Sequence, residues 1–393
     1  MINAALPYID QDYMVSIRRQ LHMYPEIGFD LPTTLNLVRT ELDKMGVTYT
    51  ERFGKSCIVA YLNDHIKSLT IGLRADMDAL AIQEKNDVEY KSRIDGAMHA
   101  CGHDVHTATL LGTLKALNQV KDEIKCRLVF LFQAAEEGLD GAQSMVDDGV
   151  TDEFDFIIGC HVDNTIEAGS AMFRKGPTFA SSDSFKIELF GKSGHGAAPH
   201  AAIDAINMGI KVYNELQSMV AKEIDPLISR VLSVTIFNAG NANNILPDHC
   251  VLGGTIRTHS NETADYIKKR MDEIVSNVAQ QAGGRSKVEF GRSLPAVISD
   301  GEIAEKLCNS ALNAGINARF RETPLMYSED FANYLKEKPG AFFFLGSRNT
   351  EKGIISMTHN NDFDVDESCL EVGAKIYTQF IFENMGGLKY IGL

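Results

Sequence analysis

The apolar residues near the start of the chain recur about one helical turn apart, which predicts two amphipathic α-helices over residues 9–24 and 32–45. Proline is expected to end the first helix before Pro25 and suits the opening turn of the second at Pro32. The predicted inward-facing positions are Ile9, Tyr13, Ile17, Leu21, Leu37, Val38, Leu42 and Met45.

Short continuous apolar runs follow, typical of strands that are buried on both faces. They cover residues 57–62, 69–73, 128–132, 154–160 and 341–346. Helical periodicity separates or follows several of these runs, at 110–117, 303–313 and 367–383. Strands that alternate with helices predict an α/β domain with a mostly parallel sheet.

The pattern changes near residue 182, where apolar and polar residues alternate as in a half-exposed strand. Strands are predicted at 184–190, 230–236, 250–257 and 286–290, with helices at 202–219 and 261–282. The order β-α-β-β-α-β is that of a small antiparallel sheet with two helices on one face. We therefore predict an inserted α+β domain over residues 182–292, within a main domain built from residues 1–181 and 293–393.

Composition restricts the partners. The formal net charge is -15, with 38 basic and 53 acidic residues, which argues against a nucleic acid or an anionic membrane as a partner. No apolar run approaches the roughly 20 residues that cross a bilayer, and the N-terminus lacks the pattern of a secretion signal. Seven cysteines without framework spacing suit reduced thiols. We expect a cytoplasmic protein.

The segment 97–106 holds the densest candidate chemistry, because it places a thiol and three imidazoles just before an apolar helix. Cys101 and His103 have the spacing of paired metal ligands, and Gly102 is expected to leave room for an approaching metal. His106 lies one helical turn further on and is expected to support a ligand. Taken alone, the segment fits a buried cysteine and capping histidines better than a metal site, and the other candidate ligands decide the matter.

Further polar side chains follow the predicted strands. Asp76 comes after the 69–73 strand, the pair Glu136 and Glu137 after 128–132, and His161 after 154–160. The carboxyl ends of parallel strands meet at one edge of a sheet, so these groups are expected to converge there. Asp76 is expected to orient a ligand histidine.

Another histidine, His359, precedes the last predicted helix. The candidate ligands then number five, and they are Cys101, His103, Glu137, His161 and His359. A structural zinc needs only four ligands, so five with a carboxylate fit two metals that share a bridge. One carboxylate of the Glu136–Glu137 pair would coordinate and the other would act as a general base.

A set of motifs distributed over residues 18–383 resembles the amidohydrolase branch of the aminoacylase and carboxypeptidase-G superfamily. The motifs are GLRADMDAL, MHACGHDVHTATLLG, FQAAEEGLDGAQSM, GCHVD, GKSGHGAAPHAAIDAI, NAGNANNILPD, GGTIRT, SEDFANYL and MTHNNDFDVDE. The resemblance implies that the five candidates are the metal ligands, with Cys101 as the bridging thiolate. It also implies that Glu136 is the general base.

The inserted domain resembles the lid and dimerisation domain of that family. The resemblance implies that His195 reaches toward the substrate carbonyl, often from the neighbouring subunit, and that Asn244 lies near the same oxyanion. Arg257 matches an arginine that holds the substrate carboxylate, for which a planar guanidinium is suited. A homodimer or a higher homo-oligomer is implied as well. Without the resemblance these residues would be interpreted as a loop histidine, a turn asparagine and a strand-end arginine.

The function implied is hydrolysis of the amide bond of N-acyl-amino acids, with acetyl, benzoyl or similar acyl groups, to a carboxylic acid and a free amino acid. Two divalent cations per subunit are expected. Manganese and zinc are the preferred candidates, and cobalt and nickel are also compatible. A thiolate, imidazoles and a carboxylate do not select one metal by affinity alone. Ala81 and Ala134 replace prolines found in many relatives, which leaves the acyl group and the amino acid open.

Two other functions stay open. A metal-dependent dipeptidase would use the same chemistry on a peptide with a free amine, and Arg257 serves either substrate. A metal-containing binding protein without turnover is disfavoured by the retention of both Glu136 and Glu137, since a binder needs no general base. A zinc-dependent dehydrogenase is excluded because no GxGxxG sequence follows a predicted strand.

Overall fold

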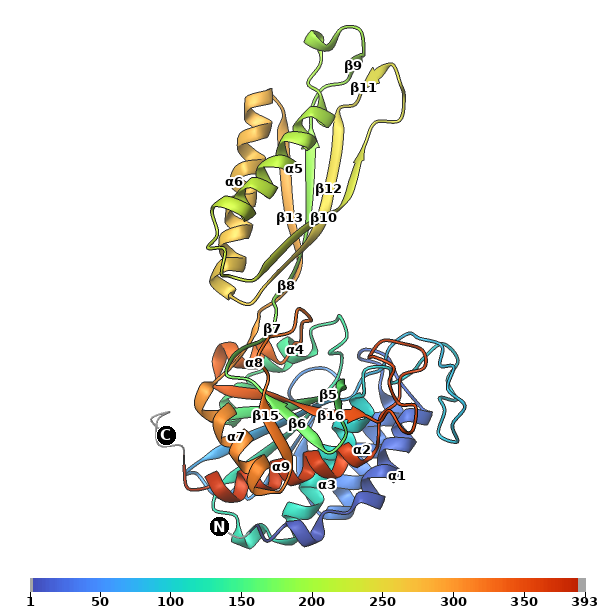
Figure 1. The fold of residues 1–393 in the computed structure, drawn as a ribbon, viewed down its shortest axis with the longest axis vertical. Coiled ribbons are helices and arrows are strands. Elements are labelled where there is room, and N and C mark those ends of the chain that lie inside the picture. Colours follow the sequence, from blue (N-terminus) through green and yellow to red (C-terminus); the bar gives the residue numbers. More distant parts are fainter. Residues whose placement is uncertain (1–2, 388–393) are drawn as a thin grey trace. The chain divides into compact units, whose positions relative to one another are not determined.

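The computed structural model describes residues 3–387 and divides into two compact units (Figure 1). The first unit contains the N-terminal part up to Gly176, Ile298–Thr323 and the C-terminal part from Asp330. The second contains Pro177–Val297 and Pro324–Glu329, and the insertion expected over 182–292 lies inside it. Within the described part of the chain, none of the helices combines the length and apolar character that a membrane crossing requires.

The first unit contains an eight-stranded sheet in the order β1-β2-β4-β3-β5-β16-β6-β15. Its strands are β1 (Thr48–Thr50), β2 (Ile58–Leu62), β3 (Thr70–Asp76), β4 (Arg127–Gln133), β5 (Phe156–Glu167), β6 (Ser170–Phe173), β15 (Asn317–Phe320) and β16 (Gly340–Arg348). The central strands β4, β3, β5 and β16 run parallel, whereas β1, β2 and the β16–β6 pair are antiparallel. The predicted α/β class with a mainly parallel sheet is confirmed.

Helices surround this sheet (Figure 1). They are α1 (Gln11–Met23), α2 (Pro32–Met45), α3 (His103–Gln119), α4 (Gly141–Asp147), α7 (Gly301–Asn313), α8 (Ala332–Glu337) and α9 (Ser368–Asn384). Short 3-10 turns lie at Leu6–Tyr8, Lys121–Glu123 and Val150–Glu153. The first two helices occur where the periodicity predicts them, but α1 buries Met14, Arg18 and His22, and leaves Tyr13 partly exposed.

The second unit has a four-stranded antiparallel sheet in the order β10-β12-β8-β13. Its strands are β8 (Ser182–Phe190), β10 (Arg230–Ala239), β12 (His249–Thr258) and β13 (Arg285–Leu294). Helices α5 (Ala205–Lys222) and α6 (Asn261–Ala282) pack on one face of this sheet and share one apolar core with it (Figure 1). The order of these elements is the predicted β-α-β-β-α-β.

Small elements complete the second unit and its boundaries. Strand β9 (Gly194–His195) pairs with β11 (Ile245–Leu246), and a 3-10 turn follows at Pro199–Ala201. Strand β7 (Gly176–Phe179) pairs with β14 (Val297–Ser299). None of these short pieces was predicted, because two to four residues carry too little periodicity to identify a strand.

The parallel strands of the first unit explain where its polar residues gather. Because β3 is parallel to both β4 and β5, the segments that follow Asp76 and Gln133 emerge at the same edge of the sheet as the second half of β5. His161 is the sixth of the twelve residues of β5, directly before that half, and helix α3 begins at His103.

Candidate metal centre

Two groups of possible metal ligands share the sulfur of Cys101. The first group is Cys101, His103 and His161, and the second is Cys101, Glu137 and His359. In each group one ligand atom from every residue lies within 4.8 Å of the others. The structure therefore brings together all five residues that were expected to bind metal.

Gly102 separates two of these residues at the turn into α3. Its φ of +90° is left-handed, and a Cβ atom there would lie 2.4 Å from the Val162 side chain. The expectation that Gly102 leaves room for an approaching metal is wrong, because the space that a side chain would enter is already filled by Val162. Glycine is required because the backbone is left-handed here and because Val162 of β5 leaves no room for a Cβ atom. It lets Cys101 and His103 face the same cluster.

His103 is completely buried, and neither ring nitrogen has a hydrogen-bond partner. Asp78 Oδ1 lies 3.5 Å from Nδ1, and Asp76 Oδ2 lies 3.7 Å from Nε2. Burial opposes charging of the ring, but Asp76 and Asp78 raise the pKa of His103 well above its usual value. A buried imidazole without hydrogen bonds is costly, and a cation at a ring nitrogen would remove that cost.

His161 is held in one tautomer. Its Nδ1 lies 2.7 Å from the carbonyl oxygen of Val162, which can only accept a hydrogen bond, so Nδ1 carries the hydrogen. The lone pair of Nε2 then faces the Cys101 sulfur at 3.3 Å. A backbone carbonyl that fixes the ring in this way is the usual support of a metal-binding histidine.

The Cys101 thiol is buried beside acidic groups. Burial is the main reason that the pKa of Cys101 is raised well above its usual value, and Glu137 raises it further. A thiolate at this position therefore needs a nearby cation. The donor set of thiol, imidazoles and carboxylate thus fits a divalent cation.

Asp78 fixes the backbone of the two adjacent glutamates. Its carboxylate accepts hydrogen bonds from the amides of Glu136 at 2.9 Å and of Glu137 at 3.1 Å. Ala135 precedes them with a left-handed φ of 58°, so the turn after β4 is tightly constrained. Glu136 is only 8% exposed, and its Oε1 accepts a long hydrogen bond of 3.4 Å from the amide of Asp330.

Glu137 and His359 lie at the outer side of the cluster. Glu137 Oε1 is 3.2 Å from His359 Nε2, and the His359 side chain is 54% exposed. Burial opposes ionisation of Glu137, but His359 and His103 lower its pKa below the usual value. The His359 amide donates to the carbonyl of Ala100 at 2.7 Å, and its φ of 67° is left-handed.

Asp76 and His106 also lie near His103 but are engaged with the protein. The His106 Nδ1 donates to Asp76 Oδ1, while Nε2 accepts from the Val162 amide at 3.0 Å. Burial lowers the pKa of His106 to about 4, so the ring is neutral near pH 7. Asp76 Oδ2 is bound by Arg74 at 2.7 Å. These contacts position β3, α3 and β5 relative to one another.

A buried polar network lies beneath the cluster and was missed by the sequence reasoning. Arg74 donates to Gln133 at 2.8 Å and to Asp330 at 2.8 Å, and Gln133 donates to both oxygens of Asp330. Asp78 was missed as well, although the spacing of Asp76 and Asp78 in one motif was a usable signal. The partners of Arg74 left no comparable signal, because they are distant in the sequence.

The three remaining predicted residues belong to the second unit. His195 lies on β9 opposite Ile245, and the carbonyl of Asn244 accepts a hydrogen bond of 2.8 Å from Gly196. The amide of Ala197 donates to His195 Nδ1 at 3.0 Å, so the ring hydrogen is on Nε2. Arg257 lies on β12 opposite Val231, and burial is the main reason that its pKa is lowered.

Comparison with known proteins identifies the family. The model of peptidase family M20/M25/M40 matches residues 72–383. The chain belongs to this family. It is 37% identical over 368 residues to thermostable carboxypeptidase 1 of Saccharolobus solfataricus, covering 93% of each chain. It is 38% identical over 381 residues to IAA-amino acid hydrolase ILR1-like 4 of Arabidopsis thaliana, covering 95% of this chain and 86% of the relative.

A solved structure supports the same assignment. The Bacillus subtilis YXEP protein, described as a dinuclear metal binding peptidase of the M20 family, matches with a TM-score of 0.84 and 29% identity. The match covers 96% of this chain and 99% of that chain. The resemblance inferred from the motifs is thus confirmed, and this M20/M25/M40 chain is a hydrolase of amide bonds.

Proposed function

We propose that this chain hydrolyses the amide bond of N-acyl-amino acids, using two divalent cations held by the two ligand groups that share Cys101. The observation that carries the proposal is the pair of three-residue groups around one sulfur, with the buried Glu136 beside them. The relatives described as an IAA-amino acid hydrolase and as a dinuclear metal binding peptidase support the same chemistry.

In this proposal His103 and His161 complete one metal site, and Glu137 and His359 complete the other. Manganese or zinc is the expected metal, with cobalt or nickel also compatible, because the ligand types do not discriminate among them. When bound, two such cations would supply Lewis acidity, which polarises a carbonyl and lowers the pKa of water toward neutrality.

Glu136 performs the proton transfers. Its carboxylate is held beside His103 and Glu137 by the Asp78 and Asp330 contacts, and it accepts the proton of the attacking water. It then returns that proton to the departing nitrogen of the amide, which leaves as the free amino group. The products are a carboxylic acid and an amino acid.

The second unit provides substrate contacts in this proposal. His195 has its hydrogen on Nε2, so it can donate to the carbonyl oxygen as negative charge develops there. Asn244 supports the same oxygen, and Arg257 binds the carboxylate of the amino acid.

We further propose that the protein is a homodimer joined along β10. This strand is ten residues long and lies at the edge of the small sheet. Val231, Ile236 and Phe237 on it are 39%, 49% and 41% exposed. A long apolar edge strand is a template for pairing with a second copy of itself.

We place the protein in the cytoplasm, in keeping with seven cysteines that are all free thiols.

The test compares two neighbouring substitutions. Glu136→Gln should retain two cations per chain and lose at least about 10²-fold in turnover of an N-acetyl-amino acid, because it cannot accept a proton. Glu137→Gln should bind the second cation more weakly. Metal content and steady-state rates measured on both variants and on wild type decide the matter. Full turnover by Glu136→Gln, or wild type without turnover, would refute the proposed roles.

A peptidase function is the second candidate, because one relative, from Saccharolobus solfataricus, is described as thermostable carboxypeptidase 1. Both functions use the same cluster. They differ in the substrate, because an N-acyl-amino acid carries a simple acyl group on the amide nitrogen, whereas a peptide carries an amino acid with a free amine there. Rates on N-acetyl-amino acids, dipeptides and N-acylated dipeptides, measured with one preparation, separate them. Preference for dipeptides would replace the first candidate by the second.

A further inference from the structure

The loop over residues 356–364, hereafter the His359 loop, carries the most exposed member of the cluster. The His359 side chain is 54% exposed, whereas Cys101 and His103 are buried. The latter two lie at the start of a long buried helix, and His161 lies within a strand. Besides the hydrogen bond of its own amide to the Ala100 carbonyl at 2.7 Å, His359 depends on the contacts that fix its loop.

Asn164 ties both ends of the His359 loop to β5. Its side-chain amide donates to the carbonyl of Ser356 at 2.7 Å and to the carbonyl of Asp364 at 2.9 Å. Asn164 is 2% exposed and follows His161 by three residues on the same strand. One buried amide therefore closes the loop.

Arg18 of α1 holds the same loop from the other side. It is completely buried, and its guanidinium contacts Asp364 at 2.7 Å, Asp104 at 2.9 Å and Glu367 at 3.2 Å. Asp104 directly follows His103. The three contacts join the end of the His359 loop, the start of α9 and the start of α3 through one side chain.

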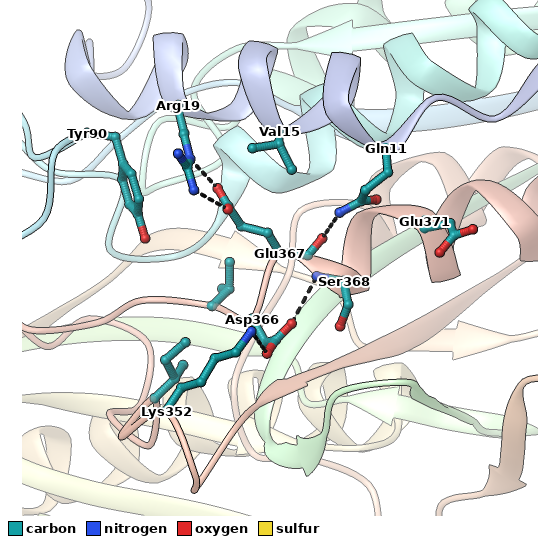
Figure 2. Close-up of a pocket in the computed structure, with 11 residues that line it drawn as sticks. Gln11, Val15, Arg19, Tyr90, Lys352, Asp366, Glu367, Ser368 and Glu371 are labelled. Carbon is teal, nitrogen blue, oxygen red and sulfur yellow. Dashed lines mark hydrogen bonds and ion pairs between the residues drawn. The ribbon is translucent and has the colours of Figure 1, made fainter.

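The outer side of this arrangement borders a cavity of about 450 Å³ between α1 and the start of α9 (Figure 2). Four of its charged groups are paired with one another: Arg19 binds Glu367 through two hydrogen bonds, and Lys352 binds Asp366 at 2.9 Å. Tyr90 lies under both arginines, with ring distances of 4.6 Å to Arg18 and 4.7 Å to Arg19. Its hydroxyl donates to Asp364 at 2.7 Å.

We propose that Arg18, together with Asn164 and Tyr90, is a positioning residue that fixes the His359 loop and thereby the second ligand group, without being needed for the first. This inference rests on the proposed two-cation function. The first group is independent of Arg18 because His103 and His161 are fixed by α3 and β5. Asp104 also keeps a second partner, His22 Nδ1 at 2.8 Å.

The chain offers a matched pair for the test. Arg18 and Arg19 are neighbours on α1, both bind Glu367 and both lie over Tyr90, but of the contacts described above only those of Arg18 include Asp364 and Asp104. Full-length Arg18→Met and Arg19→Met are titrated with Mn²⁺, and stoichiometry and affinities are measured by calorimetry. Far-UV circular dichroism establishes that each variant is folded.

Arg19→Met should bind two Mn²⁺ ions as wild type does. Arg18→Met should bind the first ion unchanged and the second at least tenfold more weakly. Unchanged affinity for both ions in Arg18→Met, or equal weakening of both, would overturn the inference. Wild type that binds fewer than two ions would instead refute the proposed function, so the two failures are distinguishable.

Tyr90→Phe decides the question if Arg18→Met does not fold. It removes only the hydroxyl that donates to Asp364 and leaves the ring under both arginines. The second Mn²⁺ ion should then bind severalfold more weakly while the first is unaffected. An unchanged second affinity in a folded Tyr90→Phe variant would contradict the positioning role.

Discussion

At the scale of single residues, the cluster combines side chains that bind with residues that only shape the backbone. Cys101, His103, Glu137, His161 and His359 offer the ligand atoms. Gly102 offers none, yet its left-handed backbone, at a position where Val162 leaves no room for a Cβ atom, determines how Cys101 and His103 are presented. A substitution at Gly102 should therefore disturb metal binding without removing a ligand.

Gly102→Ala should destabilise the fold by about 2 kcal/mol, since it adds a methyl group against Val162 and disfavours the left-handed backbone. It should also weaken binding of both cations, because Cys101 belongs to both ligand groups. Urea unfolding and Mn²⁺ titration measure the two effects. Gly301→Ala is the control, because a Cβ at Gly301 would have no neighbour within 4 Å. Equal behaviour of the two variants would contradict this explanation.

The candidate ligand residues could be selected from the sequence because cysteine, histidine and paired acids are chemically distinctive and lie next to the ends of predicted strands and helices. The spacing from Asp76 could have marked Asp78 as a candidate but could not have given its role, because a carboxylate that accepts from the backbone of Glu136 and Glu137 leaves no pattern of its own. The same holds for Asn164, whose two carbonyl partners become visible only after folding.

At the scale of the elements, α1 shows where hydrophobic periodicity stops being informative. The range of the helix was predicted well, but its buried face includes Arg18 and His22. Charged groups are buried only when they are paired, and their partners Asp104, Glu84 and Asp364 come from other parts of the chain. Periodicity within one helix contains no information about such partners.

The contacts of His22 with Asp104 and Glu84 make the stability of the fold depend on pH. Burial and Arg18 oppose protonation of His22, but Asp104 and Glu84 outweigh them and raise its pKa above 6.5. The protonated ring therefore stabilises the fold fully below the unfolded-state pKa of about 6.5, and this contribution is lost as pH rises through the folded-state pKa.

The difference in unfolding free energy between metal-free wild type and His22→Gln should accordingly be larger near pH 6 than near pH 9. Denaturant unfolding of both proteins at the two pH values measures it. A difference that is the same at both values, or larger at the higher one, would contradict a raised pKa for His22.

At the scale of the whole molecule, the sequence predicted an α/β unit and a β-α-β-β-α-β insertion because the two sheets have different hydrophobic patterns. Strands β2, β3 and β4 are continuous apolar runs, whereas β8 alternates between buried and partly or fully exposed positions. The pairing of short strands such as β6 and β15 was beyond prediction, since the paired residues Ser170 and Asn317 are 147 positions apart in the sequence.

The proposed dimer can be tested at this scale. Wild type should have a mass in solution of twice 43.3 kDa, and Ile236→Lys should have the mass of one chain, because lysine on an edge strand opposes strand pairing. Leu312→Lys on α7 is the control and should remain a dimer, although Leu312 is similarly exposed at 52%. Light scattering gives the masses. A wild-type monomer, or a dimer of Ile236→Lys, would exclude pairing along β10.

We propose that Cys101 belongs to two cation sites, one completed by His103 and His161 and the other by Glu137 and His359. Anomalous X-ray scattering from a crystal of the full chain loaded with manganese tests it most directly. We predict two peaks about 3.5–4 Å apart, on either side of the Cys101 sulfur. A single peak, or two peaks that do not share Cys101, would contradict this arrangement of two cations.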